Sequence, residues 1–302
     1  MAWPAVVLIL ISAVFHSAWN AIAKKCDTGP AFFGIAMLAT VILFLPMVPF
    51  CMPLILALPA PFWIVLALTT LCQAFYFYFL GRGYAHGEMS IVYPIARSYP
   101  IIVVTVVSLG FGRVPTWQAV IGVALIVAGC FCIQLKQFNE WDIRRFLKLA
   151  AVFALFAAGC SAGYSICDKY NIDIIGKANG GLDRPLNAAM IPMFYNWIIN
   201  LPLSLTLFAL ARKGNMPIRE TVRKYWGHAI AVGVLSFAAY GLVLAAMRFV
   251  DNVSYVVAFR QVSILLTVLI GIAHFGEQRS APKITGAVVI FAGLVLVGIF
   301  GK

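Results

Sequence analysis

Long, uninterrupted apolar runs limit the possible folds of this chain more than any other feature of its sequence. A helix that crosses a bilayer needs about 20 mostly apolar residues. Ten runs of about this length can be marked, at residues 3–23, 31–50, 62–80, 89–109, 116–134, 149–168, 187–210, 228–247, 253–273 and 284–300. The runs are continuous rather than alternating, and lipid cannot hydrogen-bond open backbone groups, so they predict helices. We expect an all-α integral membrane protein with ten transmembrane helices.

Composition and charge agree with a membrane protein. The chain is 63% hydrophobic and only 11% charged, whereas about a quarter of the residues of a soluble domain are charged. Its net charge of +12 comes from lysines and arginines that gather in the connections between runs, where they would orient a membrane protein. The sequence lacks basic-aromatic RNA-binding patterns and zinc-finger spacing. The expected partners are therefore a small-molecule substrate and the lipid bilayer, with no nucleic acid.

Motifs for a cofactor or for catalysis are absent from the sequence. The seven cysteines are odd in number and mostly lie inside apolar runs, which does not fit a disulfide framework. Cys130 and Cys132 have neither a second cysteine pair nor histidines nearby, so we expect no metal. Walker A, His-Glu-x-x-His and Gly-x-Ser-x-Gly patterns are missing. We expect neither a cofactor nor an enzyme, and we interpret the apolar N-terminus as a retained first helix rather than a signal peptide.

One segment of the sequence occurs twice. Arg97 and Arg260 each lie about a third of the way into an apolar run. Glycines then follow with a shared spacing, at residues 112, 122 and 129 and at residues 276, 286 and 293. A charged side chain within a membrane span costs roughly 3 kcal/mol on insertion scales. Its presence at equivalent places in two halves therefore indicates a duplicated site.

The duplication divides the chain into two halves of five helices. The basic connection 136–148 lies between them, and residues 18–24 align with residues 163–169 near the end of each half's first helix. Because five is odd, the two copies must enter the membrane in opposite directions. That is the inverted-repeat plan of secondary transporters, whose substrate site lies near the midplane. The predicted units are a first repeat at 1–135, the connection at 136–148 and a second repeat at 149–302.

Several motifs together resemble a known family. They are His16-Ser17-Ala18-Trp19-Asn20 with Lys24, the segment 93–97, Phe259-Arg260-Gln261-Val262-Ser263, and Gly276-Glu277 followed by Gly286 and Gly293. With these motifs the chain resembles the ten-helix EamA branch of the drug/metabolite transporter superfamily. Some members of its narrower subgroup resemble membrane proteins associated with phosphonate use.

The resemblance implies an arrangement and a role. Helices 1, 3, 4, 6, 8 and 9 would line a central cavity, and helices 5 and 10 would lie towards the outside. Most characterised relatives export metabolites, so the resemblance favours an exporter in a bacterial inner membrane. The chain departs from the family pattern at Arg113, where a glutamate equivalent to Glu277 is common.

Arg97 and Arg260 are the first candidates for substrate binding. A guanidinium presents a planar fork of donors that suits carboxylate or phosphate. The alternative is structural, with each arginine capping carbonyls or tying neighbouring helices together. Pro94 and Pro100 flank Arg97, and we expect them to loosen the helix there.

Other polar residues within the runs are weaker candidates. His16 and Asn20 are spaced i, i+4 on one helix face, where they would form a polar strip along the cavity or hydrogen-bond between helices. His16 is a candidate proton carrier. The acids Glu88 and Asp168 would either carry a proton or balance the arginines, although their places near run ends favour an interfacial position. The remaining candidate substrate contacts are Tyr76, Tyr93, Tyr164, Tyr240 and Gln261.

The leading hypothesis is a secondary active transporter that works by alternating access, as a monomer or a homodimer. Its solute would be small, organic and anionic, such as an amino acid, a related metabolite or an organophosphonate. The alternative within transport is proton-coupled efflux of cationic drugs, which requires an exposed acid deep in the bundle. A membrane-embedded enzyme or a passive channel would belong to a different class.

Two arguments about orientation disagree. Most lysines and arginines outside the runs lie in the connections that follow the first, third, fifth, seventh and ninth runs. The positive-inside rule places that side in the cytosol and both termini outside. The family resemblance implies the reverse, with cytosolic termini.

Overall fold

A computed structural model describes residues 1–23, 25–26, 29–86, 89–110, 112, 114–135, 137–140, 149–178, 185–274 and 279–301. Within these residues the regular secondary structure is entirely helical. The first half contains α1 (Trp3–Ala23), α2 (Pro30–Leu43), η1 (Leu45–Met47), α3 (Val48–Leu56), α4 (Ala60–His86), α5 (Met89–Gly110) and α6 (Trp117–Cys132). The rest contains η2 (Phe138–Glu140), α7 (Leu149–Ala178), α8 (Pro185–Lys213), α9 (Ile218–Ala246), η4 (Met247–Phe249), α10 (Val253–Phe259), α11 (Val262–His274) and α12 (Ala281–Phe300).

Each predicted apolar run coincides with helical structure. Seven helices in the described part of the chain are long and apolar enough to cross a membrane, or eight if α2 and the following helix, bent by 44°, count as one span. Two further apolar helices are shorter, Ile95–Gly110 and Trp117–Cys132. The all-helical membrane class is thus confirmed, whereas the number of ten spans stays a prediction.

α7 and α9 extend furthest beyond their predicted runs. α7 continues past residue 168 to Ala178, and α9 begins at Ile218 rather than near residue 228. The end of α7 tolerates its charges because Lys169 and Asp173, four residues apart, form an ion pair of 2.6 Å. Charged residues that the sequence placed in a connection therefore belong to a helix.

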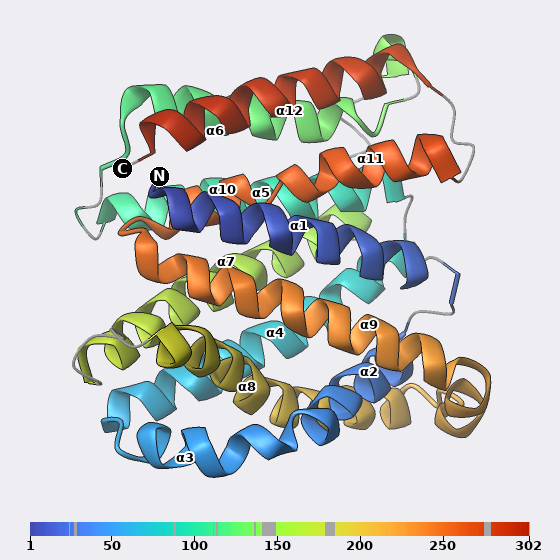
Figure 1. The fold of residues 1–302 in the computed structure, drawn as a ribbon. Coiled ribbons are helices and arrows are strands. Elements are labelled where there is room, and N and C mark those ends of the chain that lie inside the picture. The colour runs from blue at the N-terminus through green and yellow to red at the C-terminus, as the bar shows by residue number, and fades with distance from the viewer. Residues whose placement is uncertain are drawn as a thin grey trace.

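The helices lie side by side in a bundle (Figure 1). α6 and α12 pack together along one edge of the bundle, whereas α2, α3 and α8 lie at the opposite edge. Between these edges α4 packs along α7, and α1 packs along α9. The buried face of α7 consists largely of alanine, at residues 150, 151, 154, 157, 158 and 162. Small side chains of this kind allow close helix packing.

The contact between α6 and α12 depends on glycine. A Cβ atom on Gly122 would lie 2.8 Å from the carbonyl oxygen of Gly293, and one on Gly286 would lie 2.8 Å from that of Gly129. The pairs are reciprocal, because position 122 faces 293 while 129 faces 286. Four of the glycines that the sequence repeats, at 122, 129, 286 and 293, therefore face one another on two antiparallel helices.

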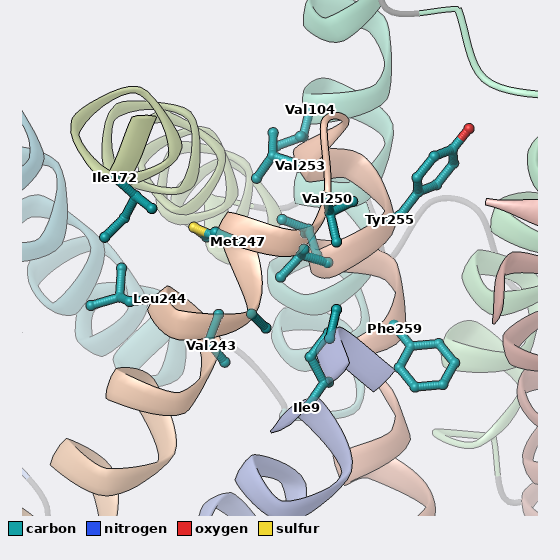
Figure 2. Close-up of a cluster of buried hydrophobic side chains, with 14 of the residues drawn as sticks. Ile9, Val104, Ile172, Val243, Leu244, Met247, Val250, Val253, Tyr255 and Phe259 are labelled. Carbon is teal, nitrogen blue, oxygen red and sulfur yellow. The ribbon is translucent and has the colours of Figure 1, made fainter. Parts of the chain in front are cut away.

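A buried apolar cluster surrounds the turn between α9 and α10 (Figure 2). The side chain of Met247 in η4 is fully buried, and Ile9, Val104 and Ile172 approach from α1, α5 and α7. After this turn Asn252 caps α10, since its side chain accepts a hydrogen bond of 3.0 Å from the backbone N–H of Ser254. The cluster and the cap together fix where α10 begins.

Candidate functional site

The regular α-helical pattern is interrupted at Arg260 and Gln261, within a stretch, Val253–Ala273, that is long and apolar enough to be one span. α10 ends at Phe259, and α11 begins at Val262. Side chains take up backbone carbonyls at the break: the Gln261 Nε2 group donates to the carbonyl of Val257 at 3.1 Å, and the Ser263 hydroxyl donates to that of Arg260 at 2.9 Å. Such bonds compete with regular helix geometry. Discontinuous helices are characteristic of transporter substrate sites.

Arg97 and Arg260 line the same small cavity of about 20 Å³. A cavity of this size holds about one water molecule. The cavity lies where α4, α5, α7 and the α10–α11 break meet, and it is lined by Tyr76, Ala96, Arg97, Pro100, Ser161, Tyr164, Val257, Arg260 and Gln261. The structure therefore brings together five of the residues that the sequence singled out.

Arg97 connects α5 to α11. Its Nη2 group donates to the Ser263 hydroxyl at 2.9 Å, and its backbone carbonyl accepts from Gln261 Nε2 at 3.3 Å. α5 continues through Pro94 and Pro100 without a break, and the loosening of the helix by these prolines stays a prediction. The break instead occurs in the copy that has no proline, where the side chains of Gln261 and Ser263 bind helix carbonyls.

Arg260 packs against the first of three tyrosine rings that contact one another in turn. Its guanidinium carbon lies 5.5 Å from the ring centre of Tyr240, a cation–π arrangement. The ring of Tyr240 packs edge to face on Tyr164 at 6.0 Å, and Tyr164 packs in the same way on Tyr76 at 6.0 Å. Three predicted tyrosines thus form a series that starts at Arg260, and two of them, Tyr164 and Tyr76, line the cavity.

Asp168 is completely buried. Its carboxylate accepts hydrogen bonds from the hydroxyls of Thr69 and Tyr195, each at 2.7 Å, and from the hydroxyl of Tyr240. The expected interfacial position near a helix end was wrong, because α7 continues well beyond this residue. Tyr240 therefore stands between the buried acid and Arg260.

Sequence reasoning missed Thr69 and Tyr195 as partners of this acid. Thr69 precedes Tyr76 by seven residues on α4, a spacing that puts both on one helix face. That periodicity was the available signal for Thr69. Tyr195 lies in an apolar run of the sequence like other tyrosines, and nothing nearby distinguishes it.

His16 lies on α1 within electrostatic reach of both Arg97 and Arg260. Its ring packs against Trp19 at 5.0 Å between ring centres. The Asn20 side-chain amide donates to the backbone carbonyl of His16 at 2.7 Å, so it bonds back onto its own helix. The predicted polar strip on α1 is thus partly taken up by local bonding.

Two candidate side chains are not described. Glu88 lies outside the described residues. Tyr93 lies within α5, but only its backbone is described. Their predicted roles stay predictions.

Comparison with known proteins adds a family and a fold. The model of the EamA-like transporter family matches residues 3–135 and 185–299. No curated protein matches the chain at a significant level. One solved structure, described only as the crystal structure of a protein, superposes with a TM-score of 0.70 at 14% sequence identity, over 99% of this chain and 98% of that one. At this identity the superposition establishes a shared fold and nothing more.

Proposed function

Because this chain belongs to the EamA-like transporter family, we propose that it is a secondary active transporter of a small organic solute with an anionic group. The resemblance to the drug/metabolite transporter superfamily is confirmed. Family membership and the apolar helices make the chain a multi-pass membrane protein. Amino acids, related metabolites and organophosphonates are the proposed solutes, and export from the cytosol across a bacterial inner membrane is the proposed direction.

The observation that carries the proposal is that two arginines from different halves line one cavity. Guanidinium groups bind carboxylate and phosphate through paired, charge-assisted hydrogen bonds. Charged groups inside membrane proteins face cavities or partners because lipid exposure is unfavourable. Arg97 and Arg260 are therefore proposed to hold the anionic group, with Tyr76, Tyr164 and Tyr240 beside it.

Alternating access is proposed to use two inverted repeats, at 1–135 and 149–302, with five helices each. The reciprocal glycine contacts of α6 and α12 support this arrangement. The helix pairs α4–α7 and α1–α9 support it as well. When α1 is matched to α7 and α4 is matched to α9, each pair corresponds to the other. Rocking of one repeat against the other would expose the arginines to each side in turn.

Asp168 is the proposed proton-coupling group, with His16 as a second candidate. Asp168 is joined to the arginine site by one residue, since Tyr240 both hydrogen-bonds its carboxylate and packs under Arg260. An anion bound at Arg260 would therefore affect the protonation of Asp168 through Tyr240.

Cationic drug efflux is the second candidate, and the buried acid is the observation that favours it. A cation would need free carboxylate oxygens facing the cavity. Asp168 already accepts from Thr69, Tyr195 and Tyr240, and it is fully buried behind them. The arginines line the cavity and the acid does not, so the anionic solute is the better-supported substrate.

A thermal-stability screen of the purified protein tests the proposal, because a ligand that binds the folded state raises the apparent midpoint. Amino acids, aminophosphonates, organic acids and cationic dyes would be compared. We expect an anionic or zwitterionic solute to shift the wild type. Loss of a charged hydrogen bond in Arg97→Gln or Arg260→Gln should weaken binding on the order of 10- to 100-fold.

The matched control is Arg82→Gln. Arg82 is an exposed arginine at the end of α4 that packs over Phe153 and does not line the cavity. It should respond like the wild type. If the Arg97 and Arg260 variants also respond like the wild type, or if only cationic dyes bind, the proposed substrate class is wrong.

A further inference from the structure

Only one of the two polar atoms of the Gln261 side-chain amide, Nε2, has hydrogen-bond partners among the described residues. Its Nε2 group donates to the backbone carbonyls of Val257 and Arg97, at 3.1 and 3.3 Å. Because both partners are acceptors, the amide must present its NH₂ group to them, which fixes its orientation. The side chain is only 4% exposed. Its Oε1 atom is buried and accepts no hydrogen bond from any residue that the structure describes.

Two donor groups close to Gln261 have other acceptors. The Nη2 group of Arg97 donates to Ser263, and the hydroxyl of Ser263 donates to the carbonyl of Arg260. The guanidinium of Arg260 lies over the ring of Tyr240. A buried carbonyl oxygen without a donor is unfavourable, and most such groups in folded proteins are paired. Here the oxygen belongs to a residue that lines the candidate substrate cavity.

We propose that the transported anion carries a hydrogen-bond donor, an ammonium or hydroxyl group, next to its acid group, and that Gln261 Oε1 accepts this bond. This inference rests on the proposed function, since the arginines must hold the acid group. Arg97, Arg260 and Gln261 line one small cavity, so the donor and the acid must be close neighbours in the solute. α-Amino acids, α-hydroxy acids and aminomethylphosphonate meet this requirement.

Gln261 is thereby the specificity-determining residue of the site. A site built to hydrogen-bond a donor rejects an analogue without one, because the buried acceptor is then left unpaired. A plain carboxylate such as propionate would engage the arginines but leave Oε1 unsatisfied. The site should therefore distinguish solutes that differ by a single amino or hydroxyl group.

Paired solutes test the inference on the purified full-length protein. Binding of alanine, lactate and propionate would be compared by calorimetry, as would that of aminomethylphosphonate and methylphosphonate. We expect the solute with the donor to bind at least about tenfold more tightly than its plain analogue. Two variants isolate Oε1: Gln261→Met removes both polar atoms, whereas Gln261→Glu removes the donating NH₂ group but keeps an accepting oxygen.

We expect Gln261→Met to lose the preference and Gln261→Glu to keep it for the amino solutes. Both variants lose the Nε2 bonds to Val257 and Arg97, so loss of those bonds cannot explain a preference that only Gln261→Met abolishes. Gln73→Met, at a buried glutamine of α4 outside the cavity lining, is the control and should keep the wild-type preference.

The outcomes separate the inference from the proposed function. Equal binding of paired solutes by the wild type, with loss of both in Arg260→Gln, would overturn the inference and leave the anion site standing. A preference that survives in Gln261→Met would also overturn it, since selection would then lie elsewhere. Failure of every anion to bind the wild type would refute the proposed function and the inference together.

Discussion

Asp168 is the buried charge on which energy coupling is proposed to depend. Three hydroxyls donate to its carboxylate, from Thr69, Tyr195 and Tyr240. Hydrogen bonds of this kind stabilise the ionised form, whereas burial disfavours it. Tyr240 connects the carboxylate of Asp168 to the guanidinium of Arg260, so a change of charge at one site should affect binding at the other.

Asp168→Asn is expected to abolish proton-gradient-driven transport and to retain solute binding. The asparagine oxygen still accepts from Thr69 and Tyr195, so the cluster keeps most of its hydrogen bonds, but the site can no longer take up a proton. Reconstituted vesicles would be used to compare transport driven by a pH gradient with solute exchange at equal pH. Gradient-driven transport at the wild-type rate in this variant would exclude Asp168 as the coupling group.

At the residue level a repeated segment marked the two arginines, and the family resemblance marked the tyrosines through the helices that it assigns to the cavity. The repeat indicated that Arg97 and Arg260 belong together, and both line one cavity. The depth of Asp168 could not be predicted, because Lys169 and Asp173 nearby read as a charged connection. Their ion pair within α7 requires the helix to continue. The orphan oxygen of Gln261 depends on atomic packing that no sequence pattern encodes.

Between elements, the α6–α12 contact is set by glycine and offers a direct test. In Gly129→Ala the added Cβ would lie 2.6 Å from Ile290 Cγ1 and 2.7 Å from the carbonyl of Gly286. The helices must separate, which should destabilise the protein by about 1–3 kcal/mol. Thermal unfolding in detergent, followed by circular dichroism, would show a lower midpoint than the wild type.

Gly159→Ala in α7 is the matched control. Its Cβ would meet nothing within 4 Å, and alanine is a better helix former than glycine. The midpoint should therefore stay level or rise. An equal fall in both variants would mean that loss of glycine, rather than the close helix contact, is responsible.

The positions of the helices could be predicted from apolar runs, but the interruption at Arg260 could not. The bend after α2 occurs at prolines, with Pro46 in η1 and Pro49 at the start of α3. Such residues remove backbone donors. The interruption at Arg260 has no proline, and the side chains of Gln261 and Ser263 bind backbone carbonyls there. The length and hydrophobicity of an apolar run therefore do not predict where its helix is interrupted.

At the scale of the whole molecule, the structure alters the charge argument about orientation. In the charge count from sequence, Lys169 belonged to a connection between two apolar runs. In the structure it is 5% exposed and forms an ion pair with Asp173 inside α7. A buried, neutralised lysine contributes little to positive-inside orientation, which acts on basic residues in loops and near span ends. Five basic residues remain around the α8–α9 turn, all of them exposed: Arg212, Lys213, Arg219, Arg223 and Lys224. The bias towards one side of the bundle is therefore stronger in the structure than in the sequence.

We therefore expect the α8–α9 turn to lie in the cytosol and the α9–α10 turn outside. Glu220 and Asp251 are exposed acids that lie before and after the long apolar stretch of α9. Glu220→Cys should be protected from a membrane-impermeant thiol reagent in intact cells, and Asp251→Cys should be labelled. The unsubstituted protein supplies the background from native cysteines such as the partly exposed Cys26. The reverse pattern would place the termini in the cytosol, as the family resemblance implies. Labelling of both from outside would show that α9 does not cross the membrane, which would refute the ten-span topology.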